Sequence, residues 1–214
     1  MTPAARLRRE EMLNTYTHGL GALLTLVGMW FFWQAGKKEG GTLQIVAPLV
    51  YGLSLLTMYT ASTLYHYRLW KTGKAPFLQK IDHASIFMLT GGSYTPYTLL
   101  GLPAAWGWPI FSFVWTLSFL GMYRKLTQGT GNRRRSTVLY VLLGWTIIIA
   151  IVPMIERFPW ELWACMMGGG LFLTVGARVY MLDRIPYNHA WWHLFVMAGT
   201  GLHYFGVLWY LIPM

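Results

Sequence analysis

Residues 136–154 read STVLYVLLGWTIIIAIVPM, an apolar run that contains no charged side chain. An α-helix needs about 20 mostly apolar residues to cross the hydrocarbon core of a bilayer. Six more runs of similar length and character lie on either side of it. The sequence therefore predicts an all-α fold, a polytopic membrane protein built as a bundle of seven transmembrane helices. The candidate spans are 19–35, 43–66, 80–101, 106–123, 136–154, 160–181 and 189–211.

The composition of the whole chain supports this interpretation. Of its 214 residues, 55% are apolar and 11% are charged, whereas soluble domains carry about 25% charged residues. The same values exclude a disordered chain, which would be poor in apolar residues and rich in charge. The loops are too short to hold a second domain. We therefore expect residues 1–214 to form a single membrane domain, with residues 1–18 as an N-terminal segment leading into the first helix.

The third run is the least hydrophobic of the seven. Its middle contains Gly91, Gly92, Ser93, Thr95 and Pro96. A kinked segment frees backbone groups that lipid cannot satisfy. We therefore expect a kink in this helix, covered by neighbouring helices.

The basic residues are distributed unevenly along the chain, which has 17 Lys and Arg against 7 Asp and Glu, for a net charge of +10. In a soluble protein such an excess would suggest a nucleic-acid partner. Here all of them except Lys37, Lys38 and Arg157 lie on the side of the N-terminus and of the loops after the second, fourth and sixth runs. Because cytoplasmic loops are enriched in Lys and Arg, we expect a cytoplasmic N-terminus, an external C-terminus, membrane lipids as partners and no nucleic acid.

Ionisable side chains inside membrane helices are costly and mark candidate functional sites. All six histidines fall within or at the ends of the predicted spans, and Asp82 is the one acid just inside a span. Residues four apart share a helix face. The predicted topology brings five of these polar side chains to one depth near the cytoplasmic side: Ser62, His66, Asp82, His189 and His193.

Three imidazoles beside a carboxylate favour a zinc site with three protein ligands and a water in the fourth position. We expect His66, His189 and His193 to bind the metal, which lowers the pKa of its water toward ~7. Asp82 is expected to accept a hydrogen bond from that water or to act as general base. Ser62 can bond the water or a substrate carbonyl. The segment 189–193, HAWWH, lacks the glutamate of the soluble H-E-x-x-H metalloproteases.

A simpler alternative is that each histidine is an interfacial hydrogen-bonding residue without a ligand. For His18 the sequence leaves helix packing and support of the metal ligands equally open. His83 lies beside Asp82 but points to another side of the helix, which favours a structural role. His203 lies about 15 Å deeper than His193, so we expect it to bond another helix or to line a cavity.

Several segments resemble, in order along the chain, those of the bacterial hemolysin III branch of the progestin and adipoQ receptor (PAQR) superfamily, which includes the membrane homeostasis proteins of the inner membrane. The resemblance covers almost the whole chain and is specific when the segments are taken together. They are NTYTHG at 14–19, ASTLYH at 61–66, IDHASI at 81–86, GSYTP at 92–96, RIPYNHAWWH at 184–193 and HY at 203–204.

The resemblance implies a seven-helix bundle in the bacterial cytoplasmic (inner) membrane, with zinc bound near the cytoplasmic side. By motif, the zinc ligands fall on His66, His189 and His193. The family aspartate that contacts the zinc-bound water falls on Asp82, and the serine of the S-x-x-x-H pattern on Ser62. The chain lacks the long N-terminal extension of the adiponectin receptors, so a protein hormone is not expected as a partner.

The leading hypothesis is a role in membrane lipid (fluidity) homeostasis, through zinc-dependent hydrolysis of a lipid amide or ester, as the related receptors and alkaline ceramidases suggest. One alternative is a non-catalytic lipid sensor with structural zinc, in which the third helix moves. Another is a pore-forming hemolysin. Against the pore, no span carries an evident stripe of charged or hydroxyl side chains along its full length.

Overall fold

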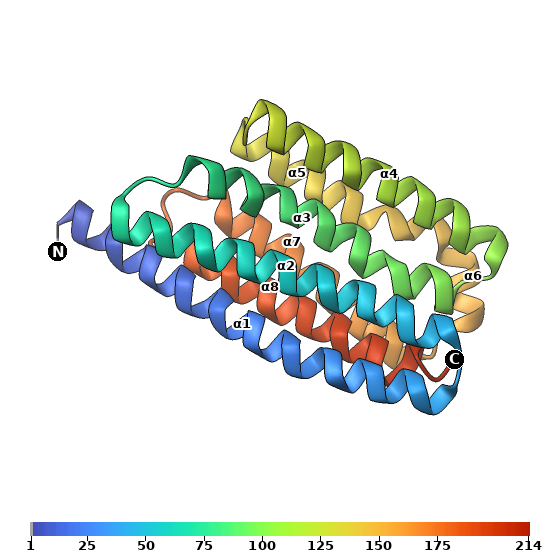
Figure 1. Ribbon diagram of the computed structural model, residues 1–214. Coiled ribbons are helices and arrows are strands. Elements are labelled where there is room, and N and C mark those ends of the chain that lie inside the picture. The colour runs from blue at the N-terminus through green and yellow to red at the C-terminus, as the bar shows by residue number, and fades with distance from the viewer. Residues whose placement is uncertain (1) are drawn as a thin grey trace.

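The computed structural model describes residues 2–214, and every regular element within this range is helical. Seven rods run back and forth along the bundle (Figure 1), and they coincide with the seven predicted spans, so the all-α seven-helix prediction is confirmed. Their bounds are α1 Pro3–Glu39; α2 Thr42–Thr72; α3 Pro76–Pro96, continued by the π-helical segment η1 Tyr97–Gly101; α4 Ala104–Gln128; α5 Arg133–Gly144, continued by the 3₁₀ segment η2 Trp145–Ala150 and by α6 Ile151–Arg157; α7 Trp160–Tyr180; and α8 Asn188–Gly206, continued by the π-helical segment η3 Val207–Leu211.

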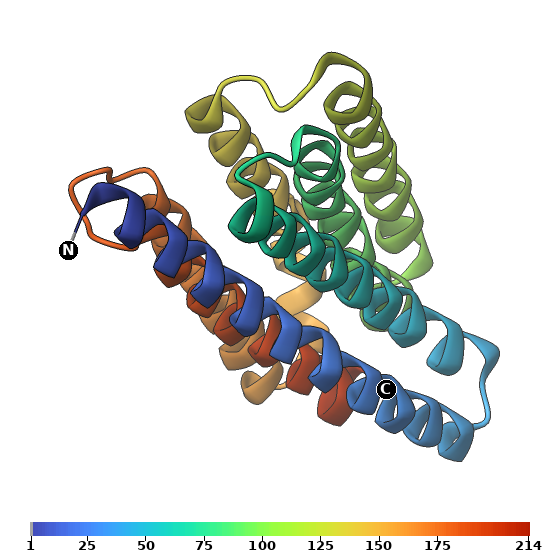
Figure 2. The ribbon, with the colours of Figure 1, turned by 60° about the vertical axis from the view of Figure 1, so that its left-hand side comes forward.

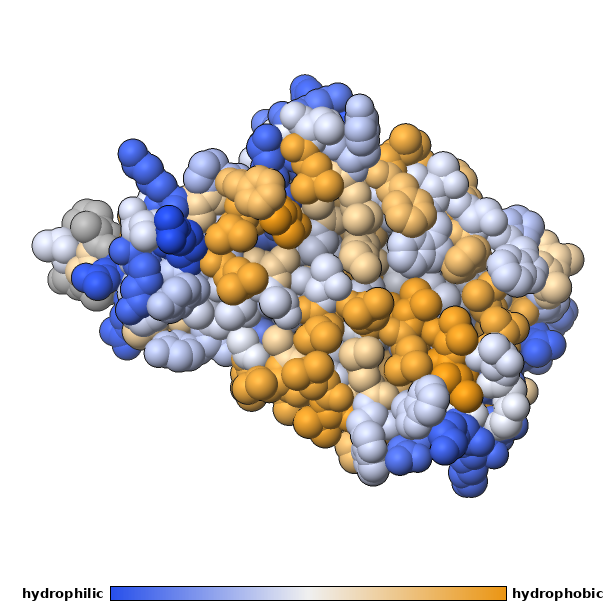
Figure 3. Space-filling view, viewed as in Figure 1, coloured by the Kyte–Doolittle hydropathy of each residue, from blue (hydrophilic) through white to orange (hydrophobic). Residues whose placement is uncertain are grey.

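The outer surface of the bundle is apolar along its middle. Five of the seven rods in the described part of the chain are long and apolar enough to cross a membrane: α1, α2, the α5–η2–α6 rod, α7 and α8–η3. The remaining two are α3 and α4. Figure 3 shows hydrophobic side chains in a broad band across the molecule, with hydrophilic residues at its two ends. This distribution is expected of helices that face lipid on the outside.

Short capped connections turn the chain at each end of the bundle. The Thr2 hydroxyl accepts a hydrogen bond from the backbone N–H of Ala5 and so caps the start of α1. Gly40 and Gly73 end α1 and α2 with φ angles of 78° and 70°, a left-handed conformation that glycine adopts at little cost. Such short turns make consecutive helices antiparallel neighbours.

The first helix is longer than its predicted span. The segment expected to lead into it is itself helical, because α1 begins at Pro3 and continues without a break to Glu39. Its start has two favourable signals, the Thr2 cap and a proline at the first helical position. The extension runs alongside the end of the bundle where α2 ends and α8 begins (Figure 1), which brings residues near Glu11 into the site described below.

The third and fifth rods both change their helical spacing. The backbone hydrogen bonds of α3 keep the α-helical pattern through Gly91 and Gly92. The pattern becomes π-helical only after Pro96, which has no N–H to donate to the helix. In the fifth rod the 3₁₀ segment η2 interrupts a run for which the sequence predicts a continuous helix. There the Tyr94 hydroxyl accepts a hydrogen bond from the backbone N–H of Ile147 at 2.8 Å.

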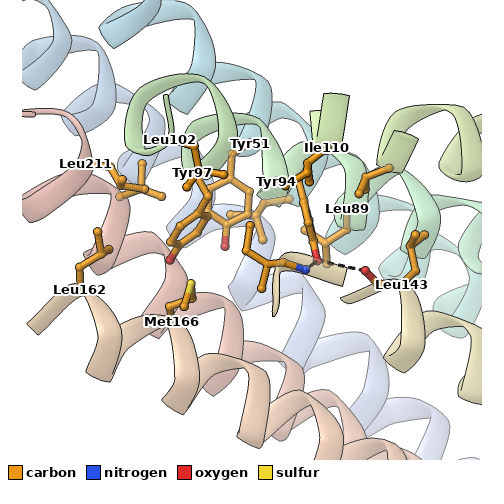
Figure 4. Packing of buried hydrophobic residues seen from close by; sticks show 14 of the residues in the cluster. Tyr51, Leu89, Tyr94, Tyr97, Leu102, Ile110, Leu143, Leu162, Met166 and Leu211 are labelled. Carbon is orange, nitrogen blue, oxygen red and sulfur yellow. Dashed lines mark hydrogen bonds between the residues drawn. The ribbon is translucent and has the colours of Figure 1, made fainter. Parts of the chain in front are cut away.

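The same hydroxyl donates to the carbonyl of Leu143 at 3.1 Å (Figure 4) or to that of Gly144 at 2.8 Å. A side chain inserted into a helical ladder in this way is a recognised cause of helix breaks. Pro153 adds to the effect, since it cannot bond the carbonyl four residues earlier. Tyr94 therefore satisfies backbone groups that the break would leave unpaired in an apolar interior.

The buried core draws side chains from across the bundle. Its fully buried members include Phe32 of α1, Tyr51 of α2, Val114 of α4, Leu162 of α7 and Val207 of η3. Figures 1 and 2 show α1 and α8 side by side on one flank and α4 on the opposite flank. In this arrangement the end of α2 and the starts of α3 and α8 meet at one end of the bundle, where the predicted site residues lie.

Candidate metal centre

Three histidines from two helices converge at the end of the bundle. His66 lies near the end of α2, and His189 and His193 lie in the first turns of α8. One ring nitrogen from each can be chosen so that all three lie within 4.8 Å of one another. The i, i+4 spacing places His189 and His193 on the same face of α8, and the antiparallel course of the chain brings His66 to their level. The group can hold a metal ion.

The burial of these rings fits a metal better than solvent. His66 and His193 are each 1% exposed, and within the described residues the Nε2 atom of His66 is buried without a hydrogen-bond partner. An unpaired buried polar atom is costly. Neutral imidazole nitrogen is a preferred zinc ligand, so a metal at this position would give that atom its missing partner.

The N-terminal part of α1 contacts all three histidines. The Glu11 carboxylate lies 2.6 Å from Nδ1 of His66, and the Thr17 hydroxyl lies 3.2 Å from Nδ1 of His193. Glu10 accepts a hydrogen bond from the backbone N–H of His189 at 3.2 Å. The sequence does not predict this role, because Glu10 and Glu11 lie in residues 1–18, the segment expected to precede the first membrane span.

Ser62 and Asp82 line the same cavity as His189 and His193. Ser62 is one turn before His66 on α2, and its side chain lies next to the Asp82 carboxyl near the start of α3. Both side chains are buried. The structure thus brings together all five residues that the sequence selected, from three different helices. Asp82 is not the only acid here, since Glu11 contacts His66 directly.

The other histidines have distinct surroundings. His18 stacks on His193 with ring centroids 3.5 Å apart, and within the described residues neither of its ring nitrogens has a hydrogen-bond partner. Its contact with His193 agrees with both roles left open by the sequence, packing and support of a ligand. His83 lines the same cavity as Asp82, and its backbone carbonyl accepts a bond from Tyr140. His203 bonds the Tyr97 hydroxyl at 3.1 Å and lines the cavity at its deeper end, as predicted.

The site opens onto a cavity of about 160 Å³ in the interior of the bundle. Ser62, Asp82, His189 and His193 line one end of it. Apolar side chains line much of the rest, among them Leu89, Met166, Leu173 and Val196. A mostly apolar cavity with a few convergent polar groups is the usual form of a small-molecule site.

Comparisons with known proteins agree in covering nearly the whole chain. A family model described as "Haemolysin-III related" matches residues 7–204, a range that includes every residue of the site. Hemolysin-3 of Bacillus cereus is 34% identical over 217 aligned residues, which cover 100% of this chain and 97% of that protein. The Hemolysin-3 homolog of Bacillus subtilis (strain 168) is 33% identical over 204 residues, covering 95% of each. The human monocyte to macrophage differentiation factor is more distant, at 23% identity over 207 residues, with 94% of this chain and 84% of that protein covered.

Proposed function

The chain belongs to the haemolysin-III-related family of membrane proteins, and on that premise we propose that it is a zinc-binding protein of the bacterial inner membrane that acts on membrane lipid. Its reaction is hydrolysis of a lipid amide or ester, with a consequence for membrane composition and fluidity. One observation carries the proposal: Ser62 and Asp82 share a largely apolar cavity with His189 and His193, two of the three histidines whose ring nitrogens converge.

The donor set of the cluster is suited to zinc. His66, His189 and His193 supply three imidazole nitrogens. The Glu11 carboxylate contacts the other ring nitrogen of His66, and a zinc-bound histidine usually has a carboxylate or another acceptor at that position. Zinc held by these residues would supply a Lewis acid for the lipid carbonyl and would make a nearby water more acidic. Three protein ligands leave a further coordination position for water or substrate.

Asp82 transfers the proton in the proposed reaction, and Ser62 binds the oxygen of the lipid carbonyl. The buried Asp82 carboxylate takes a proton from the attacking water as the water oxygen bonds to the lipid carbonyl carbon. It then gives that proton to the departing amine or alcohol as the carbonyl–heteroatom bond breaks. Ser62, next to Asp82, donates a hydrogen bond to the carbonyl oxygen. The apolar lining keeps bulk water out and holds the acyl chain.

The lipid enters from the bilayer into the side of the bundle. Trp145 of η2 and Thr174 of α7 both line the cavity, and the indole N–H of Trp145 donates to the Thr174 hydroxyl at 2.9 Å. At this position the cavity wall is formed by side chains from two rods. A wall of this kind can open by rotation of one side chain, which supports lateral entry.

Metal analysis tests the first part of the proposal. The purified protein is compared with a variant in which His66, His189 and His193 are all replaced by Ala. We expect about one zinc per wild-type chain and none in the triple variant. Equal zinc contents in the two proteins would reject the metal site.

The Asp82→Asn variant tests catalysis. We expect it to retain zinc and to lose turnover of lipid amides or esters presented in liposomes, because asparagine cannot carry the proton. Glu156→Gln is the control, since Glu156 is exposed and outside the cavity. If Asp82→Asn keeps both zinc and full turnover, hydrolysis by this mechanism is wrong.

A second candidate function is lipid sensing without catalysis, and the break in the fifth rod favours it. Tyr94, Gly144 and Ile147 line the cavity and also form the hydrogen bonds at the break. A lipid in the cavity would therefore contact an element whose backbone bonding is already rearranged. Sensing predicts lipid binding without turnover, and an unchanged membrane phenotype in the Asp82→Asn variant.

A further inference from the structure

The N-terminal extension of α1 makes a specific set of hydrogen bonds with the histidine cluster. Its residues reach Nδ1 of His66, Nδ1 of His193 and the backbone of His189. The rings of His66 and His193 therefore both contact α1 through Nδ1. In a neutral imidazole one nitrogen donates a hydrogen bond and the other accepts or binds a metal. The partner of one nitrogen thus decides what the other can do.

For His66 the partner is Glu11. An ionised carboxylate only accepts hydrogen bonds, so with Glu11 ionised the 2.6 Å contact places a proton on Nδ1 of His66. The amide nitrogen of Asn14 lies 3.5 Å from the same Nδ1, at the limit of a hydrogen bond. The shorter, charge-assisted contact is the stronger one. Nε2 of His66 therefore carries the free lone pair, and this is the buried atom without a partner.

For His193 the partner is Thr17, whose hydroxyl proton is already used in another hydrogen bond. Thr17 donates it to the backbone carbonyl of Leu13 at 2.9 Å or of Asn14 at 3.1 Å. Its oxygen therefore accepts from Nδ1–H of His193 at 3.2 Å. The lone pair of His193 is left on Nε2, as it is in His66.

We infer that α1 sets the tautomers of the metal ligands, with Glu11 and Thr17 acting as positioning residues that hold the Nε2 lone pairs of His66 and His193 ready for the metal. This inference rests on the proposed zinc site and adds a third helix to it, since the ligands themselves come from α2 and α8. Metal-bound histidines commonly donate their other ring N–H to a carboxylate or another acceptor, which fixes both tautomer and ring orientation.

The tautomers can be read without any metal. The full chain is labelled with ¹⁵N-histidine, stripped of metal in detergent micelles, and examined by long-range ¹H–¹⁵N correlation at a pH where the rings are neutral. We expect His66 and His193 as Nδ1–H tautomers. Glu11→Ala should convert His66 to a mixture, and Thr17→Val should do the same for His193. Finding either ring as Nε2–H in the wild type would overturn the inference.

Zinc affinity provides the second measurement, by competition with a chromogenic chelator. We expect Glu11→Ala to weaken zinc binding by about 10- to 100-fold, the usual effect of losing such a partner. Glu11→Gln should weaken it less, because its amide oxygen still accepts from Nδ1–H. Thr17→Val should also weaken binding, and Thr17→Ser should restore it.

Two control variants separate positioning from general destabilisation. Glu39→Gln changes an exposed acid at the far end of the same helix. Thr57→Val removes a hydroxyl that bonds only a backbone carbonyl, that of Leu53. Neither should change zinc affinity. Wild-type affinity in both Glu11→Ala and Thr17→Val would reject the inference while leaving the zinc site intact. Absence of zinc from the wild type would instead reject the proposed function, and the metal-free tautomers would still decide this inference.

Discussion

The six histidines of this chain differ mainly in what their ring nitrogens contact. His66 uses Nδ1 for Glu11 and leaves Nε2 unpaired, whereas His203 uses Nδ1 for the Tyr97 hydroxyl, deeper in the bundle. His18 contributes a ring face, stacked on His193. Only a nitrogen that is unprotonated and turned toward other ligands can bind a metal. Burial alone therefore does not make a histidine a ligand.

This distinction predicts opposite results for two residues on the same helix. His193→Phe should abolish zinc binding, because it removes one of the three converging nitrogens. His203→Phe should leave the zinc content unchanged, since its ring bonds Tyr97 and lies outside the group. It should lower the thermal stability by about 1–3 kcal/mol, the cost of leaving a buried hydroxyl unpaired. Elemental analysis and thermal unfolding in detergent measure the two effects; zinc loss in His203→Phe would contradict the assignment.

At the level of residues, helical spacing and topology were enough to select Ser62, His66, Asp82, His189 and His193. They were not enough to find Glu11. The sequence signal for Glu11 is its spacing from Asn14 and His18. Intervals of three and four residues place these polar side chains on one face of a helix that continues the first span. Hydropathy hides this signal, because the polar extension lies outside the apolar window.

At the level of elements, the backbones of α7 and α8 approach each other closely at a pair of glycines. A Cβ added to Gly199 would lie 2.9 Å from the backbone oxygen of Gly169, and a Cβ added to Gly169 would lie 2.9 Å from that of Gly199. Small residues let membrane helices approach closely in this way. Both glycines lie in clusters of small residues, 168–170 on α7 and 199–201 on α8, and the two backbones approach each other at one residue of each cluster.

The two glycines that flank Thr200 should therefore respond differently to a methyl group. Gly199→Ala should destabilise the protein by about 1–3 kcal/mol, because the new Cβ meets backbone that cannot move aside. Gly201→Ala meets nothing within 4 Å and should stabilise the helix by about 0.5–1 kcal/mol, since alanine is the better helix former. Thermal unfolding of the two variants in one detergent measures the difference. Equal melting temperatures would show that the α7–α8 contact is not tight.

The break between α5 and η2 depends on one hydroxyl from another helix. Tyr94→Phe leaves the N–H of Ile147 and the carbonyl of Gly144 without their partner. We expect a loss of about 1–3 kcal/mol and faster amide hydrogen exchange around Ile147. Tyr123→Phe, on an exposed face of α4, should change neither quantity. Unchanged exchange in Tyr94→Phe would mean that Pro153 alone maintains the break.

At the level of the whole molecule, most rods were predictable because a membrane-spanning helix needs an apolar run of nearly fixed length, and five of the seven rods in the described part of the chain meet this requirement. Length and hydropathy do not indicate where a helix continues beyond its apolar run. They therefore did not predict the extension of α1 to Pro3 or that of α2 to Thr72. They also do not report hydrogen bonds between helices, and η2 depends on one of those. The uneven distribution of Lys and Arg adds the orientation in the membrane, which remains a prediction.

Single-cysteine labelling tests that orientation. In a Cys165→Ser background the chain has no other cysteine. Glu39, the last residue of α1, and Thr72, the last residue of α2, are exposed residues at opposite ends of the bundle. Because Lys and Arg concentrate on the side of Thr72, the positive-inside rule places that side in the cytoplasm. A membrane-impermeant maleimide should therefore label Glu39→Cys in intact cells and Thr72→Cys only after permeabilisation. The reverse pattern would place the N-terminus, and with it the histidine cluster, on the external side of the membrane.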